Sequence, residues 1–467
     1  MNPQELLLAP TSRLVHIGPH KTGTTSVQTA FHVGRTMLRQ HGVHYAGSLE
    51  QPLLAALAVA GGGGMRGSRP PRPEDWTELV DEVRDAGEQR VVVSTEFLSY
   101  ADEAAARRVV TELTGGPVHV VITLRPIYKI APSQWQQYVQ NGLRVPYDEW
   151  LDGMFRRPPY DQPTPSFWRR HKQDELVRRW AGVAGAGNLT VVVADESDPG
   201  MLLRTFEAFV GLPEGSLVPT ENAANRSLTF GEIELVRRLN VEFEERRWSD
   251  EAHARFVRHG AARRMKRGRR PAPDEPRLPM PKWALERAAE VGAETVETIT
   301  SLGVRGVGDM STLAAVPDKV AEDDELTAMP LLPGNAVALA VLGAIAASGR
   351  VDATEQQLAR AISTLAAGIG EDAAKDGDLQ GLPPVPADAA ALAVLSAITV
   401  GAAVSLVKQK KKLVPNTDVP VEQRLVRDVR ARELVRAVVQ RGRRRLRRPL
   451  GGRQGPSRAK PGAALGR

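Results

Sequence analysis

The stretch RLVHIGPHKTGTTSVQTAF, residues 13–31, runs from an apolar segment through a loop of glycine, lysine and threonine into a stretch with helical spacing. Residues 13–17 are predicted to form a buried strand, and apolar residues recur at helical spacing from Val27 to Leu38, after which Gly42 can end the helix. Glycines allow a tight turn and a close approach of backbone to ligand. Free amides and the dipole at a helix N-terminus favour an anion. Lys21 adds a full positive charge, so the loop is predicted to bind phosphate.

Three further apolar stretches extend this pattern along the chain. Residues 91–94, 118–124 and 189–194 read as strands, with helical stretches such as 74–87 between them. Strands that are apolar on both faces and separated by helices form parallel sheets covered on both sides. We therefore predict an α/β fold: a three-layer arrangement with a parallel sheet and helices on both faces. Residues 49–75, rich in Ala, Gly and Pro, are expected to be an insertion or a flexible loop.

Polar side chains follow each predicted strand. They include Lys21, Glu96, Arg125 and Glu196. Ligands of such sheets bind at the carboxyl ends of the strands. We expect these four residues to converge there.

The spacing in the loop differs from that of a Walker A motif. That motif places Lys directly after its second glycine and then Ser or Thr. Here Lys21 comes two residues before Gly23, and Thr24 follows the glycine. ATP or GTP with magnesium is therefore a weaker interpretation than another phosphate-bearing ligand, and a P-loop kinase remains the alternative enzyme class. A plain capped helix start is the structural alternative.

The stretch GPHKTGTTSVQ resembles the 5′-phosphosulfate loop of sulfotransferases that use 3′-phosphoadenosine 5′-phosphosulfate (PAPS). The second signature of that family, an Arg at a strand end and a Ser eight residues later, is similar to VITLRPIYKIAPSQW with Arg125 and Ser133. Three later segments also look like bacterial members that sulfate carbohydrates: RWAGVAGAGNLTVVVADE, NRSLTFGEIELVRRLN and GVRGVGDMSTL. The resemblance covers roughly residues 10–316.

The resemblance implies a P-loop-like fold, PAPS as the sulfuryl donor, no metal ion and a carbohydrate or glycolipid acceptor. Its first motif assigns the phosphosulfate to Gly18, Lys21, Thr22, Gly23, Thr24, Thr25 and Ser26. Its second motif assigns the 3′-phosphate to Arg125 and Ser133. Arg suits a terminal phosphate because it binds in a bidentate manner. The structural alternatives are a strand-end salt bridge for Arg125 and a helix N-cap after Pro132 for Ser133.

The acceptor hydroxyl must lose a proton, usually to a histidine or a carboxylate. Glu96, just past a strand end, is the preferred base, and several carbohydrate sulfotransferases use a Glu in this role. His20, inside the phosphate loop, is the second candidate for the base. Glu96 could instead form a structural ion pair with Lys21 or Arg125, or cap the next helix. The candidate catalytic residues are Lys21, Glu96 and His20.

Two other histidines are weaker candidates for the catalytic base. His16 lies in an apolar strand and is expected to be a hydrogen-bonded core residue. His171 is a weaker candidate that could reach the acceptor.

Residues 144–171 concentrate aromatic side chains in a chain that has only 5% of them. The aromatic residues are mixed with Arg and Pro. One interpretation is a lid that stacks on a sugar acceptor, and the other is an insertion packed onto the body. The two interpretations are compatible.

The character of the chain changes after residue 316. We predict a sulfotransferase domain over 1–316, then a linker with an Ala-rich helical segment over 317–388. An apolar helix is predicted over 389–407, and a basic, partly disordered tail over 408–467. A helix over 389–407 would span about 29 Å at ~1.5 Å per residue, close to a bilayer core of ~30 Å. Together with 326–349 it would make a membrane hairpin, and helices buried in a soluble protein are the alternative.

Charge is distributed unevenly. From Lys408 to the end, five Lys and fourteen Arg stand against two Asp and two Glu, which gives +15; the whole chain carries +7, so the preceding residues carry −8. The tail is therefore expected to attract an anionic membrane surface, and no feature reads nucleic-acid bases. A membrane-tethered nucleotide-binding protein without turnover is the non-enzymatic alternative.

Composition removes several classes of protein. The chain has 467 residues, 42% of them apolar and 25% charged, which excludes a wholly disordered chain. It has no cysteine, which excludes disulfides, thiolate zinc sites, iron–sulfur clusters and a Cys nucleophile. No basic segment followed by an apolar run begins the chain, so a cytoplasmic location is expected, with association at the inner face of the plasma membrane through the tail.

Overall fold

The computed structural model describes residues 3–63, 69–219, 226–317, 331–347 and 384–398. The chain divides into two compact units. Unit 1 comprises Met1–Ile233 and Arg270–Met329, and unit 2 comprises Glu234–Arg269 and Pro330–Arg467.

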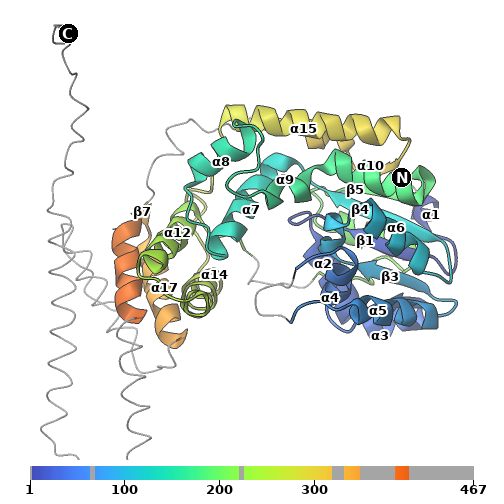
Figure 1. Ribbon diagram of the computed structural model, residues 1–467, viewed down its shortest axis with the longest axis horizontal. Coiled ribbons are helices and arrows are strands. Elements are labelled where there is room, and N and C mark those ends of the chain that lie inside the picture. The colour runs from blue at the N-terminus through green and yellow to red at the C-terminus, as the bar shows by residue number, and fades with distance from the viewer. Residues whose placement is uncertain (1–2, 64–68, 220–225, 318–330, 348–383, 399–467) are drawn as a thin grey trace, which may run out of the picture. The chain divides into compact units, whose positions relative to one another are not determined.

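Unit 1 is built on a six-stranded sheet in which every neighbouring pair of strands is parallel (Figure 1). Its strands in spatial order are β2 (Val43–Tyr45), β3 (Arg90–Ser94), β1 (Arg13–Ile17), β4 (Val118–Leu124), β5 (Leu189–Val193) and β6 (Arg305–Val307). Strand β1 lies between β3 and β4, and this position determines which residues surround the phosphate loop. The loop after β1 is flanked by the ends of β3 and β4.

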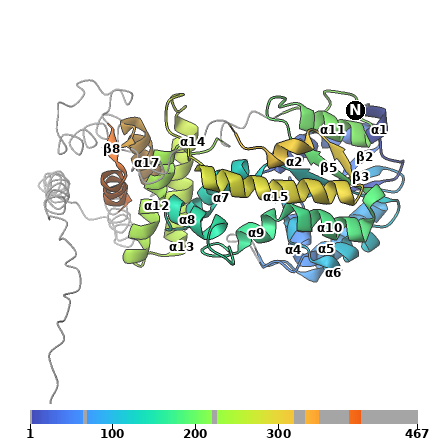
Figure 2. The ribbon, with the colours of Figure 1, turned by 90° about the horizontal axis from the view of Figure 1, so that it is seen from above.

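Helices cover both faces of this sheet (Figure 2). Alternate residues of each strand point to opposite faces, so Val15 packs in one core and Leu14 in the other. One face is covered by α4 (Leu53–Val59), α5 (Pro73–Asp85), α6 (Glu103–Glu112), α10 (Gln173–Ala184) and α15 (Lys282–Ser301). The other is covered by α1 (Pro3–Leu6), α2 (Thr24–Val33), α3 (Arg35–Gln40) and α11 (Met201–Val210). The predicted α/β fold, with a parallel sheet covered on both faces, is confirmed.

Local differences from the sequence-based expectations have simple causes. The helix expected after the phosphate loop is split at Gly34 into α2 and α3. The stretch 49–75, expected as an insertion or a loop, contains α4, whose small apolar residues pack on the sheet. The three-residue edge strands β2 and β6 are too short to carry a period-two signal.

The aromatic residues of 144–171 are mostly buried. This stretch contains α8 (Tyr147–Phe155) and α9 (Ser166–His171) and follows α7 (Ile127–Gln140). Trp150 has its ring 5.2 Å from that of Phe167 and 6.3 Å from that of Tyr147, and all three side chains are buried. The interpretation in which this segment packs its aromatics onto the body therefore accounts for these residues.

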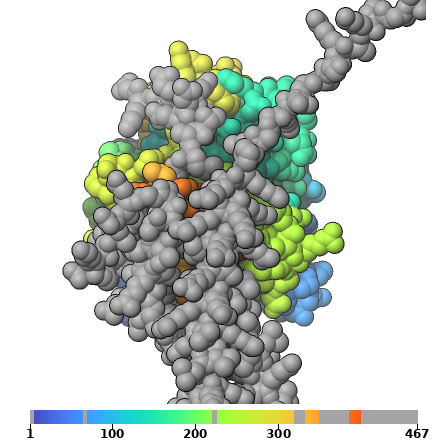
Figure 3. Space-filling model, turned by 90° about the vertical axis from the view of Figure 1, so that its left-hand side faces the viewer, coloured from blue at the N-terminus to red at the C-terminus, as the bar shows by residue number. Residues whose placement is uncertain are grey.

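Unit 2 contains the C-terminal part of α12 (Phe230–Glu245), α13 (Asp250–His253), a π-helical stretch over Ala254–Ala262, α14 (Arg263–Gly268) and α17 (Gly334–Ala347). Two short strands, β7 (Leu331–Leu332) and β8 (Val385–Pro386), pair antiparallel, and residues 387–398 are helical. Side chains of segment 234–269 are visible in yellow-green at the surface in Figure 3.

The predicted apolar segments fall only partly within the described residues. Among the helices of the described ranges, none is long and apolar enough to cross a membrane. Residues 399–407 of the predicted apolar helix and the basic tail 408–467 lie outside the described residues, as does most of 317–388. The domain boundaries predicted within and beyond 317–388 stay predictions.

Gly292 provides a test of the packing around the sheet. It lies inside α15, and a Cβ there would overlap the carbonyl oxygen of Leu313. Gly292→Ala should therefore lower the free energy of unfolding by about 1–3 kcal/mol, as overpacking does. The measurement is urea denaturation followed by tryptophan fluorescence.

The matched control is Gly182 in α10, where a Cβ would meet nothing within 4 Å. Gly182→Ala should raise the free energy of unfolding by about 1 kcal/mol, the helix-propensity gain alone. Equal effects of the two substitutions would show that α15 does not pack as described.

Candidate functional site

The loop between β1 and α2 is held from below by a chain of buried hydrogen bonds. The imidazole of His16 joins Ser94 Oγ at 2.8 Å and Thr123 Oγ1 at 3.2 Å, and so links β1 to β3 and β4. Thr123 Oγ1 lies 3.1 Å from Thr22 Oγ1, which donates to the carbonyl of Pro19 at 2.8 Å. His16 is therefore a hydrogen-bonded core residue, as expected from its place in an apolar strand.

The glycines of the loop are required by its shape. A side chain at Gly18 would overlap the hydroxyls of Thr24 and Thr123, and Thr24 donates to the Gly18 carbonyl at 3.1 Å. Gly23 precedes α2 with a φ of 92°, in the left-handed region. The Thr22 and Thr24 hydroxyls thus hold the loop together, while Gly23, Thr25 and Ser26 are exposed at the start of α2, as sites for a ligand require.

Lys21 occupies the middle of the site. Its φ of 73° is a left-handed conformation that costs a non-glycine residue of order 1–3 kcal/mol, as is common at functional sites. Its Nζ donates to Gln137 Oε1 at 3.3 Å. Burial lowers the pKa of Lys21; the charge of Glu96 opposes this shift and that of Arg125 adds to it. Lys21 is therefore within electrostatic reach of both residues.

Arg125, just after β4, joins the loop to a carboxylate. Its Nη1 donates to the Lys21 carbonyl at 3.3 Å and its Nε to Glu196 Oε1 at 2.9 Å. The ammonium of Lys129 lies 3.0 Å from Glu196 Oε2. Burial raises the pKa of Glu196, but the hydrogen bond from Lys129 and the charge of Arg125 outweigh it, so the net shift is downward. Two cations thus converge on one anion at this edge of the sheet.

Ser133 lies on the same face of α7 as these groups. Lys129, Ser133 and Gln137 are four residues apart, so their side chains share one helix face. Lys129 reaches Glu196 and Gln137 reaches Lys21, which puts the half-buried Ser133 between them. The alternative in which Ser133 caps a helix is wrong, because α7 already begins at Ile127 and Pro132 lies within it.

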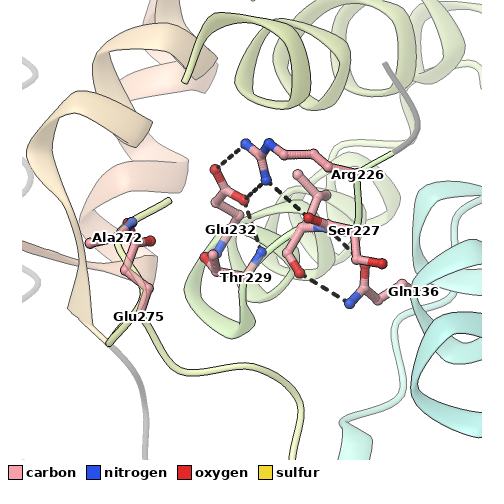
Figure 4. Close-up of polar contacts among 8 residues, drawn as sticks. Gln136, Arg226, Ser227, Thr229, Glu232, Ala272 and Glu275 are labelled. Atoms are coloured by element: carbon pink, nitrogen blue, oxygen red, sulfur yellow. Dashed lines mark hydrogen bonds and ion pairs between the residues drawn. The ribbon is translucent and has the colours of Figure 1, made fainter. Parts of the chain in front are cut away.

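The neighbouring residue Gln136 joins α7 to the segment before α12 (Figure 4). Its side-chain amide donates to the Leu228 carbonyl and accepts from the Leu228 amide, both at 3.1 Å. Glu232, fully buried, accepts from both terminal nitrogens of Arg226 at 2.8 Å and from the Thr229 amide at 2.9 Å. The Glu232 amide in turn donates to Thr229 Oγ1 at 3.4 Å, which makes a capping box at the start of α12.

Glu96 lies on the other side of the loop, at the start of the short 3₁₀ helix η1 (Glu96–Tyr100) that follows β3. Its two carboxylate oxygens each accept a side-chain amide at 3.1 Å, Oε2 from Gln28 of α2 and Oε1 from Gln51. Thr95 Oγ1 donates to Gln51 Oε1 at 2.9 Å and fixes that amide. The carboxylate is held by two neutral groups.

His20 and His171 lie near the same loop. His20 Nε2 is 3.2 Å from the hydroxyl of Tyr100, and burial, together with the charges of Arg170 and Lys21, lowers the pKa of His20 to about 3. His171 is fully buried, and burial, followed by His20, Arg170 and Lys21, lowers its pKa as well. Both imidazoles are therefore neutral at physiological pH.

The structure thus brings together Lys21, Glu96, His20, Arg125 and Ser133. Sequence reasoning did not single out Gln28, Gln51, Lys129 or Gln137, which contact them. Of these four, only Lys129 and Gln137 could have been recognised from the sequence, because each lies four residues from Ser133 and so shares its helix face. Among the described residues, no group of three or more acidic or histidine side chains is placed to hold a metal ion.

Comparison with known proteins gives one structural likeness. No family model matches the sequence, and no curated protein matches it. The crystal structure of a sulfotransferase from Alicyclobacillus acidocaldarius aligns with 54% of this chain and 97% of its own chain, at 18% sequence identity and a TM-score of 0.33. At these values the likeness carries no argument about activity. The fold class rests on the parallel sheet and helices of the chain itself.

The capping box gives a prediction for the segment that anchors α7. Thr229→Ala should lower the free energy of unfolding by about 1 kcal/mol, the usual effect of losing an N-cap. Glu232→Ala should lower it by about 3–5 kcal/mol, because it also breaks a buried ion pair. Both are measured by urea denaturation, and equal losses would contradict the buried pairing of Glu232 with Arg226.

Proposed function

We propose that the chain is a sulfotransferase that moves a sulfuryl group from PAPS to a hydroxyl of a carbohydrate or glycolipid acceptor. The observation that carries the proposal is the position of Lys21, a cation within electrostatic reach of Arg125 and of Glu96. The cation Arg125, on one side of Lys21, is suited to bind an anionic donor. The carboxylate of Glu96, on the other side, is suited to accept the proton of an acceptor hydroxyl.

The donor side is supported by its anion-binding groups. Lys21 and the amides at the start of α2 would stabilise the negative charge that develops on the leaving phosphate. Arg125, Lys129 and Ser133 would bind the 3′-phosphate that distinguishes PAPS from ATP. In the structure Arg125 and Lys129 hold the carboxylate of Glu196, so these two cations already converge on an anionic oxygen group. Ligand binding would then displace Glu196.

The acceptor side is supported by the way Glu96 is held. Side-chain amides of Gln28 and Gln51 each donate to one oxygen of the carboxylate and so orient it. As the acceptor oxygen forms its bond to sulfur, the bond from sulfur to the phosphate oxygen breaks, and the acceptor proton passes to Glu96. His20, with its pKa lowered to about 3, is the poorer proton acceptor at neutral pH.

The donor assignment is tested by calorimetry of the full chain with adenosine 3′,5′-bisphosphate and, for comparison, ADP. The wild type should prefer the 3′-phosphorylated nucleotide. Arg125→Ala should reduce that preference by about tenfold or more, because a charge-assisted hydrogen bond contributes ~1.5–3 kcal/mol. Arg107→Ala, an exposed arginine of α6, is the control.

Glu196→Gln should act in the opposite direction. Removing the competing carboxylate from Arg125 and Lys129 should tighten binding of the bisphosphate by up to about fivefold, since half-exposed ion pairs contribute ~0.2–1 kcal/mol. Equal binding of the two nucleotides by the wild type would overturn the proposal. Binding of ADP that requires magnesium would favour the kinase alternative.

The base is tested by turnover with radiolabelled PAPS and an acceptor selected from a sugar panel. Glu96→Gln should lower kcat by about 10²–10⁴, the usual contribution of a general base, and leave nucleotide affinity within about twofold. Glu103→Gln, an exposed residue of α6, should change neither. If His20→Gln loses turnover while Glu96→Gln retains it, the histidine is the base.

A further inference from the structure

A second group of side chains lies next to Glu96, outside the donor site. Arg170 of α9 has its guanidinium carbon 5.1 Å from the ring centre of Tyr100 and 5.8 Å from that of Tyr138. His171 follows Arg170 directly, with its ring 5.1 Å from that of Phe167. Tyr100 ends the same 3₁₀ helix that Glu96 begins. We call Tyr100, Tyr138, Arg170 and His171 the α9 cluster.

The cluster contains polar atoms without partners. Neither ring nitrogen of His171 has a hydrogen-bond partner among the described residues, although the side chain is 0% exposed. The Nε of Arg170 is also buried and has no hydrogen-bond partner among the described residues. His16, equally buried, has both of its nitrogens bonded. An unpaired buried polar atom is costly, and in native proteins a ligand or an ordered water usually pairs with it.

The charge around the cluster is positive. Arg169 also lies over the ring of Tyr100, at 5.5 Å, and the charges of Arg170 and Lys21 act on both His20 and His171. The His171 imidazole is neutral, so it offers one donor and one acceptor. A cation between two phenol rings, backed by a neutral imidazole, is suited to an anion that also carries hydroxyl groups.

We propose that the α9 cluster is the subsite for an acidic sugar, with Arg170 binding a carboxylate of the acceptor and His171 hydrogen-bonding the same sugar. That the sugar is the acceptor rests on the proposed sulfotransferase function; that the cluster binds a sugar carboxylate does not. The subsite would set the substrate class, because a neutral sugar offers no charge to pair with Arg170.

The test measures binding of D-glucuronate and of D-glucose to the full chain by ligand-observed NMR. Each titration is made without nucleotide and with saturating adenosine 3′,5′-bisphosphate. The wild type should bind glucuronate about tenfold or more tightly than glucose, as one charge-assisted hydrogen bond predicts. Arg170→Gln should reduce this preference to about twofold or less. Arg107→Gln should leave it unchanged.

Two substitutions at His171 distinguish a role in sugar binding from a role in packing alone. His171→Gln, which keeps a donor and an acceptor, should retain most of the glucuronate affinity, whereas His171→Leu should weaken it by about tenfold. His171→Leu should also raise the melting temperature, because it removes unpaired buried polar atoms. If the leucine variant does not fold, the Arg170 comparison decides alone.

Two outcomes overturn the inference. One is a wild type that shows no preference for glucuronate, and the other is a preference that survives in Arg170→Gln. Failure of the bisphosphate to bind would instead count against the proposed function, because the glucuronate preference is measured without nucleotide as well.

Discussion

The buried hydrogen bonds beneath the phosphate loop are the interaction on which the rest of the site depends. His16 joins Ser94 and Thr123, and Thr123 joins Thr22, so one polar chain links three adjacent strands to the loop. Burial lowers the pKa of His16 to about 3, which keeps the imidazole neutral, able to donate with one nitrogen and accept with the other. In a dry interior such a chain is rigid only when every member is paired, as these members are.

The strand order turns this local constraint into a site with two sides. Because β1 lies between β3 and β4, the loop that carries Lys21 has Glu96 on one flank and Arg125 on the other. The two flanks differ in chemistry: neutral amides hold the carboxylate of Glu96, and cations gather around Glu196. A parallel sheet places such groups at one edge without any of them being close in sequence.

The parallel sheet and the phosphate loop could be predicted from the sequence, and there are physical reasons why some of the site residues could not. The strands were readable because they are apolar on both faces, and the loop because its glycines, lysine and threonines precede a helix. Arg125 and Ser133 were indicated by the resemblance to the second sulfotransferase signature. The sequence did not decide whether Ser133 begins a helix or lies within one, since Pro132 is more often near a helix start. Gln28 and Gln51 could not be found, because their contacts with Glu96 join residues 68 and 45 positions apart in the chain and carry no local pattern.

Helix α2 connects the phosphate loop to Glu96. Under the proposed function its N-terminal amides would bind the donor, and its second turn carries Gln28, which donates to Glu96. A helix that contacts both proposed sites would make the affinities of the two ligands interdependent. Such interdependence is reciprocal, so each ligand would change the affinity of the other by the same factor. The order in which two substrates enter would then be a property of one ten-residue helix.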